Sequence, residues 1–342
     1  MRAAVMRGRK LIVAEVPVPQ PGPGEVLVRT LACGICGSDL HALKHAEAFV
    51  ANARRAGRAF VMDLGRDVVM GHEFCAEIVE HGPSTRRALA VGTRVCSRPT
   101  LTRESGPESI GYSNDNPGGY GEYMRLSEAL LLEVPNGLAT DQAALTEPMA
   151  VGVHAVQKAR LAPDDAPLVI GCGPVGLAVI AALRLVNAEP IVAADFSPRR
   201  RQLAATLGAH VVVDPATTSP WTSWREAAGG RPAVVFECVG VPGILDQSMV
   251  AAPRAARIVV VGVCMEPDTI HPFLGIVKEL SFQFVLGYTQ DEFAATLGHI
   301  AEGRIPTAPL ITGRVGLDGV AAAFEALASP ESHAKILVRP GP

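Results

Sequence analysis

A glycine-rich segment, GCGPVG at positions 171–176, constrains the fold of this 342-residue chain more than any other feature. It follows the apolar run Leu168 to Ile170, which we expect to be a strand. It precedes Leu177 to Val186, which we expect to be a buried helix. A strand, a glycine turn and a helix in this order are typical of a βαβ unit that binds a dinucleotide. The sequence therefore predicts a Rossmann unit at this point.

Each glycine of this segment has its own expected role. Gly171 permits the tight turn, Gly173 lets the backbone approach a pyrophosphate, and Gly176 lets helix and strand pack closely. The free N–H groups at the start of the helix then face the phosphates. The candidate cofactor-binding residues of this segment are Gly171, Gly173, Pro174, Val175 and Gly176.

Asp195 is the residue expected to select the cofactor. It lies nineteen residues after Gly176, at the end of the next expected strand, where a carboxylate takes the adenosine ribose hydroxyls. Three arginines at 199–201 follow in the first turn of an expected helix, where cations oppose the helix dipole, so one is expected to serve a ligand. Because Asp195 would repel a 2′-phosphate, the sequence favours NAD over NADP, with Arg200 near the adenosine ribose.

The two halves of the chain differ in their predicted secondary structure. After Pro148, apolar strands alternate with helices, which predicts a parallel, doubly wound sheet covered on both faces. Before it, short strands are separated by Pro-Gly turns. The expected later strands are Leu168–Ile170, Pro190–Ala194, Val211–Val213, Ala233–Phe236, Arg257–Val261 and Phe282–Leu286. The expected helices include Val151–Ala159, Leu177–Val186 and Pro198–Leu207, the last capped by Ser197.

Two segments of the first half have distinct expectations. His41 to Arg58 is rich in alanine and is expected to be a helix. Ser97 to Pro117 is rich in Pro, Ser, Gly and Asn and is expected to be an irregular loop.

Composition excludes several classes of partner. A net charge of −3 gives no electrostatic reason to expect nucleic acid or an anionic membrane as a partner. Ala166 to Leu183 carries no charge, but glycines and Pro174 interrupt it, so a strand, a turn and a buried helix are expected there rather than a membrane span. Seven cysteines without an export signal favour a cytoplasmic, reducing compartment.

Four residues are candidate metal ligands: Cys36, His72, Glu73 and Glu147. A thiolate, an imidazole and one or two carboxylates suit a zinc ion that keeps one coordination position open. Adjacent strand residues face opposite ways, so His72 and Glu73 reach one ion only if the chain turns, which Gly71 allows. Taken singly, each ligand has a simpler interpretation: a small buried thiol, a core histidine, or an acid at a helix N-terminus. A redox pair of Cys33 and Cys36 is disfavoured because no thioredoxin-like context surrounds it.

The combination of motifs resembles the zinc-dependent medium-chain dehydrogenases of the alcohol, polyol, butanediol and threonine dehydrogenase group. The resemblance implies an α/β two-domain chain: a GroES-like β-rich catalytic domain at 1–150, a Rossmann domain at 151–298, and a return to the catalytic domain at 299–342. The site would lie between the domains. The matching segments are GICGSDLH at 34–41, GHE at 71–73, GGYGEY at 118–123, EPMAVGVHA at 147–155, GCGPVG at 171–176, FECVG at 236–240, PTAPLITG at 306–313 and HAKILV at 333–338.

The resemblance also implies roles for individual residues. Cys36, His72 and either Glu73 or Glu147 would hold the catalytic zinc, and the two glutamates are not ranked. Zinc lowers the pKa of a bound alcohol, which then passes a hydride to the nicotinamide. Ser38 and His41 would relay the alcohol proton to solvent, and Asp39 would be a turn residue or a partner behind a ligand. Further candidate cofactor-binding residues are Val239 and Gly262.

The chain departs from many relatives in three places, one of which is Ala76, where a glycine is usual three residues after Glu73. Cys96 is followed by no cysteine until Cys172, so the four-cysteine lobe that binds a structural zinc is missing, and one zinc per chain is expected. The gap between Cys36 and His72 is long, and its extra residues, about Ala46 to Asp67, are expected to border the substrate cleft. The segment 97–117 and residues near Phe273 and Tyr288 are expected to contribute pocket walls as well.

These expectations converge on an oxidoreductase that interconverts a secondary alcohol, diol or polyol with a ketone or aldehyde, using zinc and NAD. Its only expected partners are the small-molecule substrate and further copies of the chain, as a homodimer or homotetramer. Two alternatives stay open: an NADPH-preferring carbonyl reductase of the same fold, and a nucleotide-binding protein without turnover.

Overall fold

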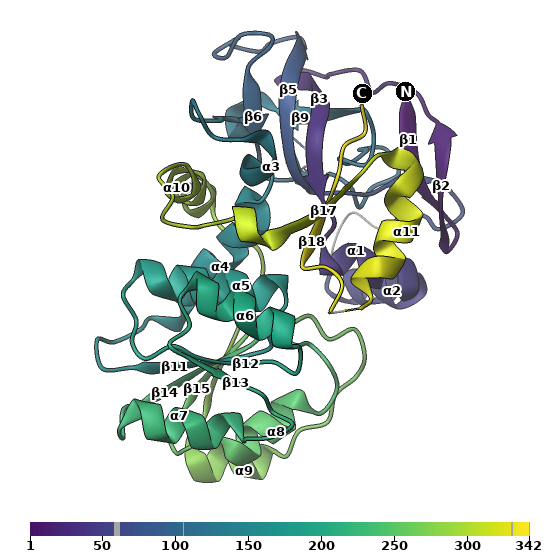
Figure 1. The fold of residues 1–342 in the computed structure, drawn as a ribbon. Helices are drawn as coiled ribbons and strands as arrows, with labels where there is room; N and C mark the ends of the chain where they lie inside the picture. Colours follow the sequence, from purple (N-terminus) through teal and green to yellow (C-terminus); the bar gives the residue numbers. More distant parts are fainter. Residues whose placement is uncertain (58–61, 105, 330, 342) are drawn as a thin grey trace.

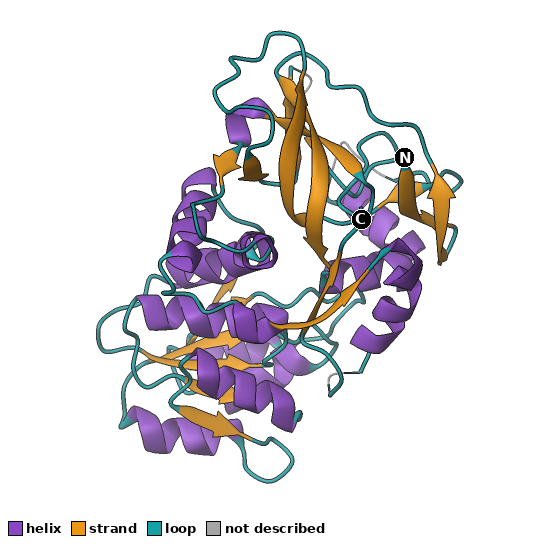
Figure 2. Cartoon of the chain, turned by 45° about the horizontal axis from the view of Figure 1, so that its top comes forward, coloured by secondary structure: helices purple, strands orange, loops and turns teal. Residues whose placement is uncertain are grey.

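The computed structural model describes residues 1–57, 62–104, 106–329 and 331–341. Within them, the chain forms two structural units that lie one above the other (Figure 1). The upper unit is built around β-sheets, and the lower unit is a sheet layered between helices (Figure 2). Three hydrophobic clusters of buried residues fill the interior of the described chain.

The upper unit contains a seven-stranded sheet with the order β10-β6-β5-β3-β18-β17, to which β9 adds by pairing with β3. A smaller sheet has the order β2-β1-β4. The strands are β1 (Arg2–Arg7), β2 (Lys10–Glu15), β3 (Glu25–Gly34), β4 (Val68–Val69), β5 (Glu73–His81), β6 (Arg94–Cys96), β9 (Tyr123–Ser127), β10 (Leu132–Glu133), β17 (Ile311–Val315) and β18 (Lys335–Val338). The strand-rich first half is therefore confirmed.

The lower unit is a six-stranded sheet with the order β13-β12-β11-β14-β15-β16, and every neighbouring pair is parallel. This confirms the predicted Rossmann architecture. The strands are β11 (Ala166–Ile170), β12 (Val192–Ala194), β13 (Val211–Val213), β14 (Ala233–Glu237), β15 (Arg257–Val260) and β16 (Ser281–Phe284).

Helices cover both faces of this parallel sheet (Figure 1). On one face lie α4 (Thr146–Ala159), α5 (Pro174–Leu185) and α6 (Pro198–Leu207); on the other lie α7 (Pro220–Ala228), α8 (Ile244–Ala251) and α9 (Pro272–Lys278). The helix at Pro198–Leu207 is as predicted, and the Ser197 hydroxyl accepts a hydrogen bond from the Arg200 N–H at 3.2 Å. The uncharged run from Ala166 is divided between β11 and α5. No helix in the described part of the chain combines the length and the hydropathy that a membrane span requires.

The C-terminal segment returns to the upper unit. After α10 (Gln290–Ala301), β17 and β18 pair with each other, and β18 joins the long strand β3 through the register Leu337 to Gly34. Helix α11 (Val320–Leu327) lies between β17 and β18 in the chain. This return places the start of β18 beside the end of β3.

Two predictions about the first half need correction. The helix expected at His41–Arg58 is two helices, α1 (Gly37–Lys44) and α2 (Ala46–Arg55), which meet at His45; Arg58 lies outside the described residues. The loop expected at 97–117 contains an antiparallel hairpin of β7 (Thr100–Arg103) and β8 (Gly106–Ser109). The burial of Leu101 explains the hairpin, because it gives this polar segment one apolar anchor in the core.

Candidate active site

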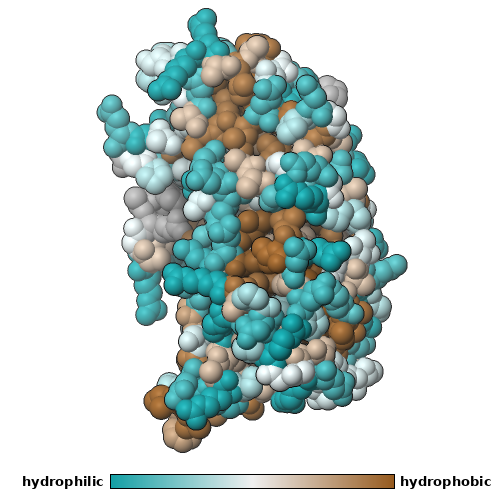
Figure 3. All heavy atoms as spheres, turned by 90° about the vertical axis from the view of Figure 1, so that its left-hand side faces the viewer, coloured by the Kyte–Doolittle hydropathy of each residue, from teal (hydrophilic) through white to brown (hydrophobic). Residues whose placement is uncertain are grey.

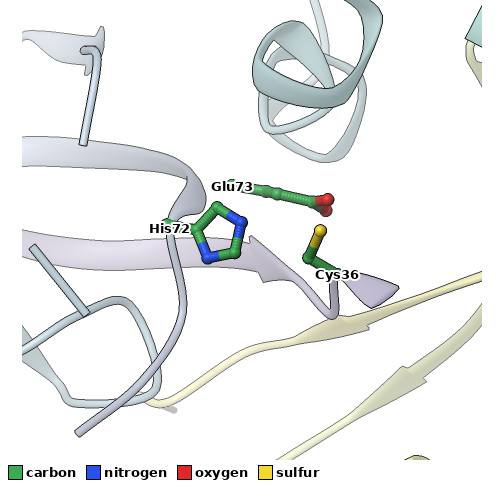
Figure 4. Close-up of side chains that lie close together, drawn as sticks. All are labelled: Cys36, His72 and Glu73. Carbon is green, nitrogen blue, oxygen red and sulfur yellow. The ribbon is translucent and has the colours of Figure 1, made fainter. Parts of the chain in front are cut away.

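Three predicted ligands come together where β3 ends and β5 begins. Cys36 precedes α1, His72 lies in the turn after β4, and Glu73 opens β5. One donor atom from each lies within 4.8 Å of the others, and the three side chains converge in Figure 4. The turn at Gly71 has φ +98°, and a Cβ there would lie 2.8 Å from the Tyr120 ring, so only glycine fits.

Asp39 orients the imidazole of His72. Its Oδ1 lies 3.4 Å from Nδ1 of His72, so the other ring nitrogen, Nε2, faces the cluster. Asp39 also accepts hydrogen bonds from the Cys36 N–H at 3.1 Å and the Tyr120 hydroxyl at 2.6 Å. Burial opposes its ionisation, but His72 and the hydroxyls of Tyr120 and Tyr112 hold the pKa of Asp39 below its ordinary value. A ligand histidine backed by a carboxylate is the usual arrangement around a metal ion.

Glu73 is fully buried and paired with Lys335 at the start of β18. The Lys335 ammonium donates to both carboxylate oxygens, at 2.8 and 2.7 Å, and to the Ile35 carbonyl at 3.0 Å. Burial alone would lower the pKa of Lys335, but the negative charges of Glu73, Cys36 and Glu147, with the hydrogen bonds to Glu73, together raise that pKa. Gly34 leaves the space that the carboxylate occupies, since a Cβ there would overlap Glu73 Oε2.

Glu147, the fourth predicted ligand, lies in the first turn of α4, outside the cluster of three. Its Oε1 accepts a hydrogen bond from the Tyr288 hydroxyl at 2.9 Å. Burial raises the pKa of Glu147 to about 7, while the positive charge of His72 opposes the rise. The four predicted ligands offer a thiolate, an imidazole and two carboxylates, and these are ligand types that bind a zinc ion.

Ser38 and His41 lie on α1, three residues apart and therefore on one face of the helix. The Ser38 hydroxyl donates to Cys36 Sγ at 3.1 Å and lies 3.5 Å from His72 Nε2. His41 is partly buried, with its ring 6.2 Å from that of His45, and burial lowers the pKa of His41. The structure therefore brings Ser38 directly against two of the predicted metal ligands.

The glycine segment forms the turn between β11 and α5. Gly171 has φ +90°, and a Cβ on Gly176 would overlap the Gly171 carbonyl oxygen, so the close approach depends on both glycines. Helix α5 begins at Pro174, after Gly173 as N-cap. A Cβ on Gly173 would meet only the Arg200 guanidinium carbon, at 4.0 Å. The backbone at Gly173 is thus open to a ligand.

Asp195 joins the glycine segment to the next strand. Its carboxylate accepts hydrogen bonds from the N–H groups of Cys172 and Ser197, both at 2.8 Å, and Arg200 lies 3.8 Å from it. Of the other two arginines, Arg201 is held by an ion pair to Asp214 at 3.1 Å, and Arg199 reaches only the Glu331 carbonyl, at 3.4 Å. Arg200 is therefore the arginine aimed at the turn.

The remaining predicted cofactor residues lie at the carboxyl ends of β14 and β15. Val239 is 42% exposed, and a Cβ on Gly171 would lie 2.7 Å from its Cγ2. A Cβ on Gly262 would lie 2.9 Å from the Val239 nitrogen. Val239 thus lies beside the glycine turn and Gly262 lies beside Val239, as expected for a site at the ends of parallel strands.

Of the residues that were expected to line the substrate pocket, some lie at the candidate site and others do not. Tyr288 contacts Glu147 and lies 6.0 Å from the guanidinium of Arg98. In contrast, Phe273 is 72% exposed on α9, at the far end of the lower unit, because α9 covers the outer face of the sheet (Figure 1). In the inserted segment, Asn52 on α2 reaches across to the Met265 carbonyl at 3.4 Å; residues 58–61 of that segment lie outside the described residues.

Sequence reasoning missed Lys335 and Tyr112. Lys335 sits inside the quoted motif HAKILV but was given no role. Tyr112 lies in the segment expected to be an irregular loop, and its hydroxyl lies 2.8 Å from both Ser38 Oγ and Asp39 Oδ1. Neither contact is local in the chain, so no short spacing pattern indicates it.

Comparison with known proteins agrees with this geometry over nearly the whole chain. Residues 22–136 match the family model of an alcohol dehydrogenase GroES-like domain, and residues 174–302 match that of a zinc-binding dehydrogenase. The chain is 35% identical to (R,R)-butanediol dehydrogenase of Bacillus subtilis (strain 168), over 99% of this chain and 100% of the relative. It is 28% identical to sorbitol dehydrogenase of Gallus gallus, over 95% and 92%.

Solved structures give the same result. The crystal structure of 2R,3R-butanediol dehydrogenase from Bacillus subtilis has a TM-score of 0.84 at 32% identity, covering 99% of both chains. A zinc-binding dehydrogenase from Sinorhizobium meliloti 1021 bound to NADP has a TM-score of 0.82 at 26% identity, also covering 99% of both chains.

The fold and the site together define a zinc-dependent oxidoreductase that acts with a nicotinamide cofactor on a small-molecule alcohol. The chain belongs to the zinc-dependent medium-chain dehydrogenase/reductase family. The resemblance of its motifs to that family is confirmed.

Proposed function

We propose that the protein reversibly oxidises a secondary alcohol or vicinal diol to a ketone, with NAD as hydride acceptor. The observation that carries the proposal is the convergence of Cys36, His72 and Glu73 within 4.8 Å. The names of the relatives support the substrate class, since they include two butanediol dehydrogenases and several sorbitol dehydrogenases, which act on diols and polyols.

Cys36 and His72 are the proposed constant ligands, with Glu73 or Glu147 as the third. A zinc ion held there would supply a Lewis acid that lowers the pKa of the substrate hydroxyl. Lys335 holds Glu73 through two hydrogen bonds, and burial favours the protonated form of Glu147 when no cation faces it. Glu73 would have to give up a hydrogen bond to Lys335 before it binds a metal, and Glu147 would have to lose its proton. Because each glutamate has such a cost, both stay in the proposed ligand set.

Ser38 and His41 are the proposed proton relay. Ser38 lies against Cys36 and His72, so its hydroxyl can accept the proton of a substrate hydroxyl placed at that cluster. His41 is partly buried on the same face of α1 and its lowered pKa favours the neutral form, which can accept a proton. The relay leads the proton away from the buried ligands.

For the cofactor, we propose NAD held by the glycine segment, with Asp195 accepting from the adenosine ribose and Arg200 beside it. The solvent-facing Val239 and the adjacent Gly262 would border the nicotinamide half. The negative charge of Asp195 disfavours a 2′-phosphate. We also propose a single zinc per chain, because the seven cysteines are unpaired and the described residues hold one group of three potential ligands.

We propose the units 1–150, 151–298 and 299–342 as the domain division. Both boundaries fall within helices, α4 and α10, which pack against each other. These helices would connect the catalytic and nucleotide-binding units and hold their relative position.

Seven unpaired cysteines support the proposed reducing, cytoplasmic compartment.

A homodimer or homotetramer is the proposed assembly. In the described chain, β16 is an edge strand of the parallel sheet, and one of its two sides pairs with no other strand. Around it, Phe284 and Leu286 are 65% and 69% exposed, and Phe273 and Ile276 on α9 are 72% and 75% exposed. Figure 3 shows hydrophobic atoms at the lower end of the molecule, where α9 lies in Figure 1. An open edge with apolar neighbours supports pairing with a second copy across a two-fold axis.

The test is NADH formation by the purified, zinc-loaded protein across secondary alcohols, vicinal diols, polyols and threonine, with NADP measured in parallel. We expect the highest kcat/KM with a diol and NAD, and a loss of at least about a hundredfold in Ser38→Ala. Preference for NADPH and a ketone would favour the carbonyl reductase. Cofactor binding without turnover on any of these alcohols would favour a protein without catalysis.

A further inference from the structure

Arg98 is a cation beside the candidate site that has no partner in the described chain. Its guanidinium carbon lies 6.0 Å from the centroid of the Tyr288 ring, and the hydroxyl of that ring donates to Glu147 Oε1 at 2.9 Å. Among the residues that the structure describes, no carboxylate pairs with Arg98, and no acceptor receives a hydrogen bond from its guanidinium. Arg98 is nevertheless partly buried.

This combination sets Arg98 apart from the other described arginines. Each of the others pairs with a carboxylate, donates a side-chain hydrogen bond, or is exposed to solvent. A partly buried cation without an anion loses hydration and gains no compensating partner. The Tyr288 ring compensates little, since 6.0 Å is the outer limit of a cation–π contact.

The backbone of Arg98 is held firmly, so the guanidinium extends from a fixed base. Arg98 follows the end of β6, and its carbonyl accepts hydrogen bonds from the Ser97 hydroxyl at 3.1 Å and the Thr100 N–H at 2.7 Å. Pro99 disfavours helical backbone in the residue before it. Only the side chain of Arg98 is therefore free to adapt to a ligand.

The charge of Arg98 acts at the candidate site. Burial, and then the charge of Glu147, raise the pKa of Tyr288 well above its ordinary value, while the positive charge of Arg98 opposes the rise. Tyr288 itself is buried, whereas Arg98 and Glu147 are both partly exposed. The contacts run from Arg98 to Tyr288 to Glu147, so one aromatic ring separates the guanidinium from the candidate site.

We propose that Arg98 selects substrates that carry an anionic group, a carboxylate or a phosphate ester, at the end remote from the reacting hydroxyl. A guanidinium stays charged and offers a planar fork of donors that fits both anions. The proposal rests on the alcohol oxidation proposed above and narrows its substrate to an anionic vicinal diol. No bond is made or broken at Arg98. Because the contact is equally strong before and during the reaction, it acts on KM rather than on kcat.

The experiment compares three four-carbon vicinal diols that differ only at the far end, which carries a carboxylate, a phosphate ester or a neutral hydroxyl. We measure kcat and KM for each, with NAD, in zinc-loaded wild type and in Arg98→Gln. In wild type, kcat/KM should be at least about tenfold higher for one or both anionic diols, as for a hydrogen bond to a charged group. The better of the two identifies the anion.

Arg98→Gln should remove this preference by raising KM for the anionic diols, with kcat unchanged and with the neutral diol affected less than about twofold. Arg225→Gln is the matched control, because Arg225 also lacks an ion pair among the described residues but is exposed on α7. It should leave the ranking of the three diols unchanged. If Arg98→Gln does not fold, Arg98→Met takes its place, since methionine keeps a contact with the Tyr288 ring.

A second readout does not depend on turnover. Calorimetry measures the binding of butyl phosphate and of butanoate, which have no hydroxyl to oxidise, to the zinc-loaded protein with NAD. We expect wild type to bind at least one of them about tenfold more tightly than Arg98→Gln does.

Three outcomes would overturn the proposal: equal use of all three diols by wild type, equal losses on all three in Arg98→Gln, or anion binding that is the same in wild type and Arg98→Gln. A wild type that binds the anions through Arg98 but oxidises no diol would instead overturn the proposed function.

Discussion

Lys335 and Glu73 form a buried ion pair that joins the last strand of the chain to the candidate metal site. The ammonium donates to both carboxylate oxygens, at 2.8 and 2.7 Å, although 262 residues separate the two. The side chains are 4% and 0% exposed, so neither charge is solvated. The pair therefore ties the C-terminal return of the chain to the residues that would hold zinc.

Lys335→Met should strongly destabilise the metal-free protein. Removing one partner leaves the other as an uncompensated buried charge, which costs about 3–5 kcal/mol. Urea unfolding of the metal-free protein measures the loss. The double variant Lys335→Met with Glu73→Gln should recover most of it, because the unpaired charge is then gone. A loss below about 1 kcal/mol in the single variant would show that the pair is not buried as described.

Metal analysis should give one zinc per chain. Cys96 is buried, and its thiol donates to the Ala143 carbonyl at 3.3 Å. Four neighbouring cysteines are needed for the structural site of relatives, and the chain has none between Cys96 and Cys172. Elemental analysis after extensive dialysis checks the count. Two tightly held zinc ions per chain would refute the single-site account.

Asp195→Ala should shift the cofactor preference from NAD towards NADP. The change removes the proposed charged acceptor for the ribose hydroxyls and the proposed repulsion of a 2′-phosphate, and it leaves Arg200 without its neighbour at 3.8 Å. We expect kcat/KM for NAD to fall about tenfold or more, as for a hydrogen bond to a charged group. Arg199→Ala, which alters an exposed arginine nearby, is the control and should leave the ratio of the two cofactors unchanged. An unaltered ratio in Asp195→Ala would exclude the role of Asp195.

Asp141 should make stability depend on pH at the acidic end. It pairs with Arg314 at 2.6 Å and Arg339 at 2.8 Å, and although burial opposes ionisation, these arginines lower the pKa of Asp141. A lowered folded pKa means that the contribution is present above the unfolded pKa, about 3.9, and is lost as pH falls through the folded value.

Asp141→Asn should therefore cost about 1 kcal/mol at neutral pH, a modest value because both arginines are about half exposed. The cost should shrink as the pH falls below about 4. Unfolding of wild type and variant over a pH series measures it. A cost that stays constant down to pH about 3 would mean that the charge of Asp141 is not the source.

The residues that sequence analysis placed at the site are those in local motifs. The adjacent pair His72 and Glu73 could be assigned to one ion because Gly71 permits a turn, and the structure has that turn with φ +98°. The glycine turn at Gly171 and Gly176 was equally local. Such features depend on backbone geometry over a few residues, which the order of residue types reveals.

The contacts that sequence analysis missed depend on tertiary register. Lys335 reaches Glu73 because β18 pairs with β3, and Tyr112 reaches Ser38 across 74 residues. The hairpin at 100–109 was missed because its polar residues resemble a loop until Leu101 is seen to be buried. Such contacts follow from how strands pair over long separations, which no short pattern encodes.

The most direct test of the account is zinc-dependent NADH formation from a vicinal diol. The protein is assayed as purified, after chelation, and after zinc is restored, with Cys36→Ala treated in the same way. We predict that chelation abolishes NADH formation, that zinc restores it in wild type, and that Cys36→Ala stays inactive throughout. Undiminished diol oxidation by the metal-free protein, or by Cys36→Ala, would contradict the central claim that Cys36, His72 and a glutamate hold the catalytic zinc.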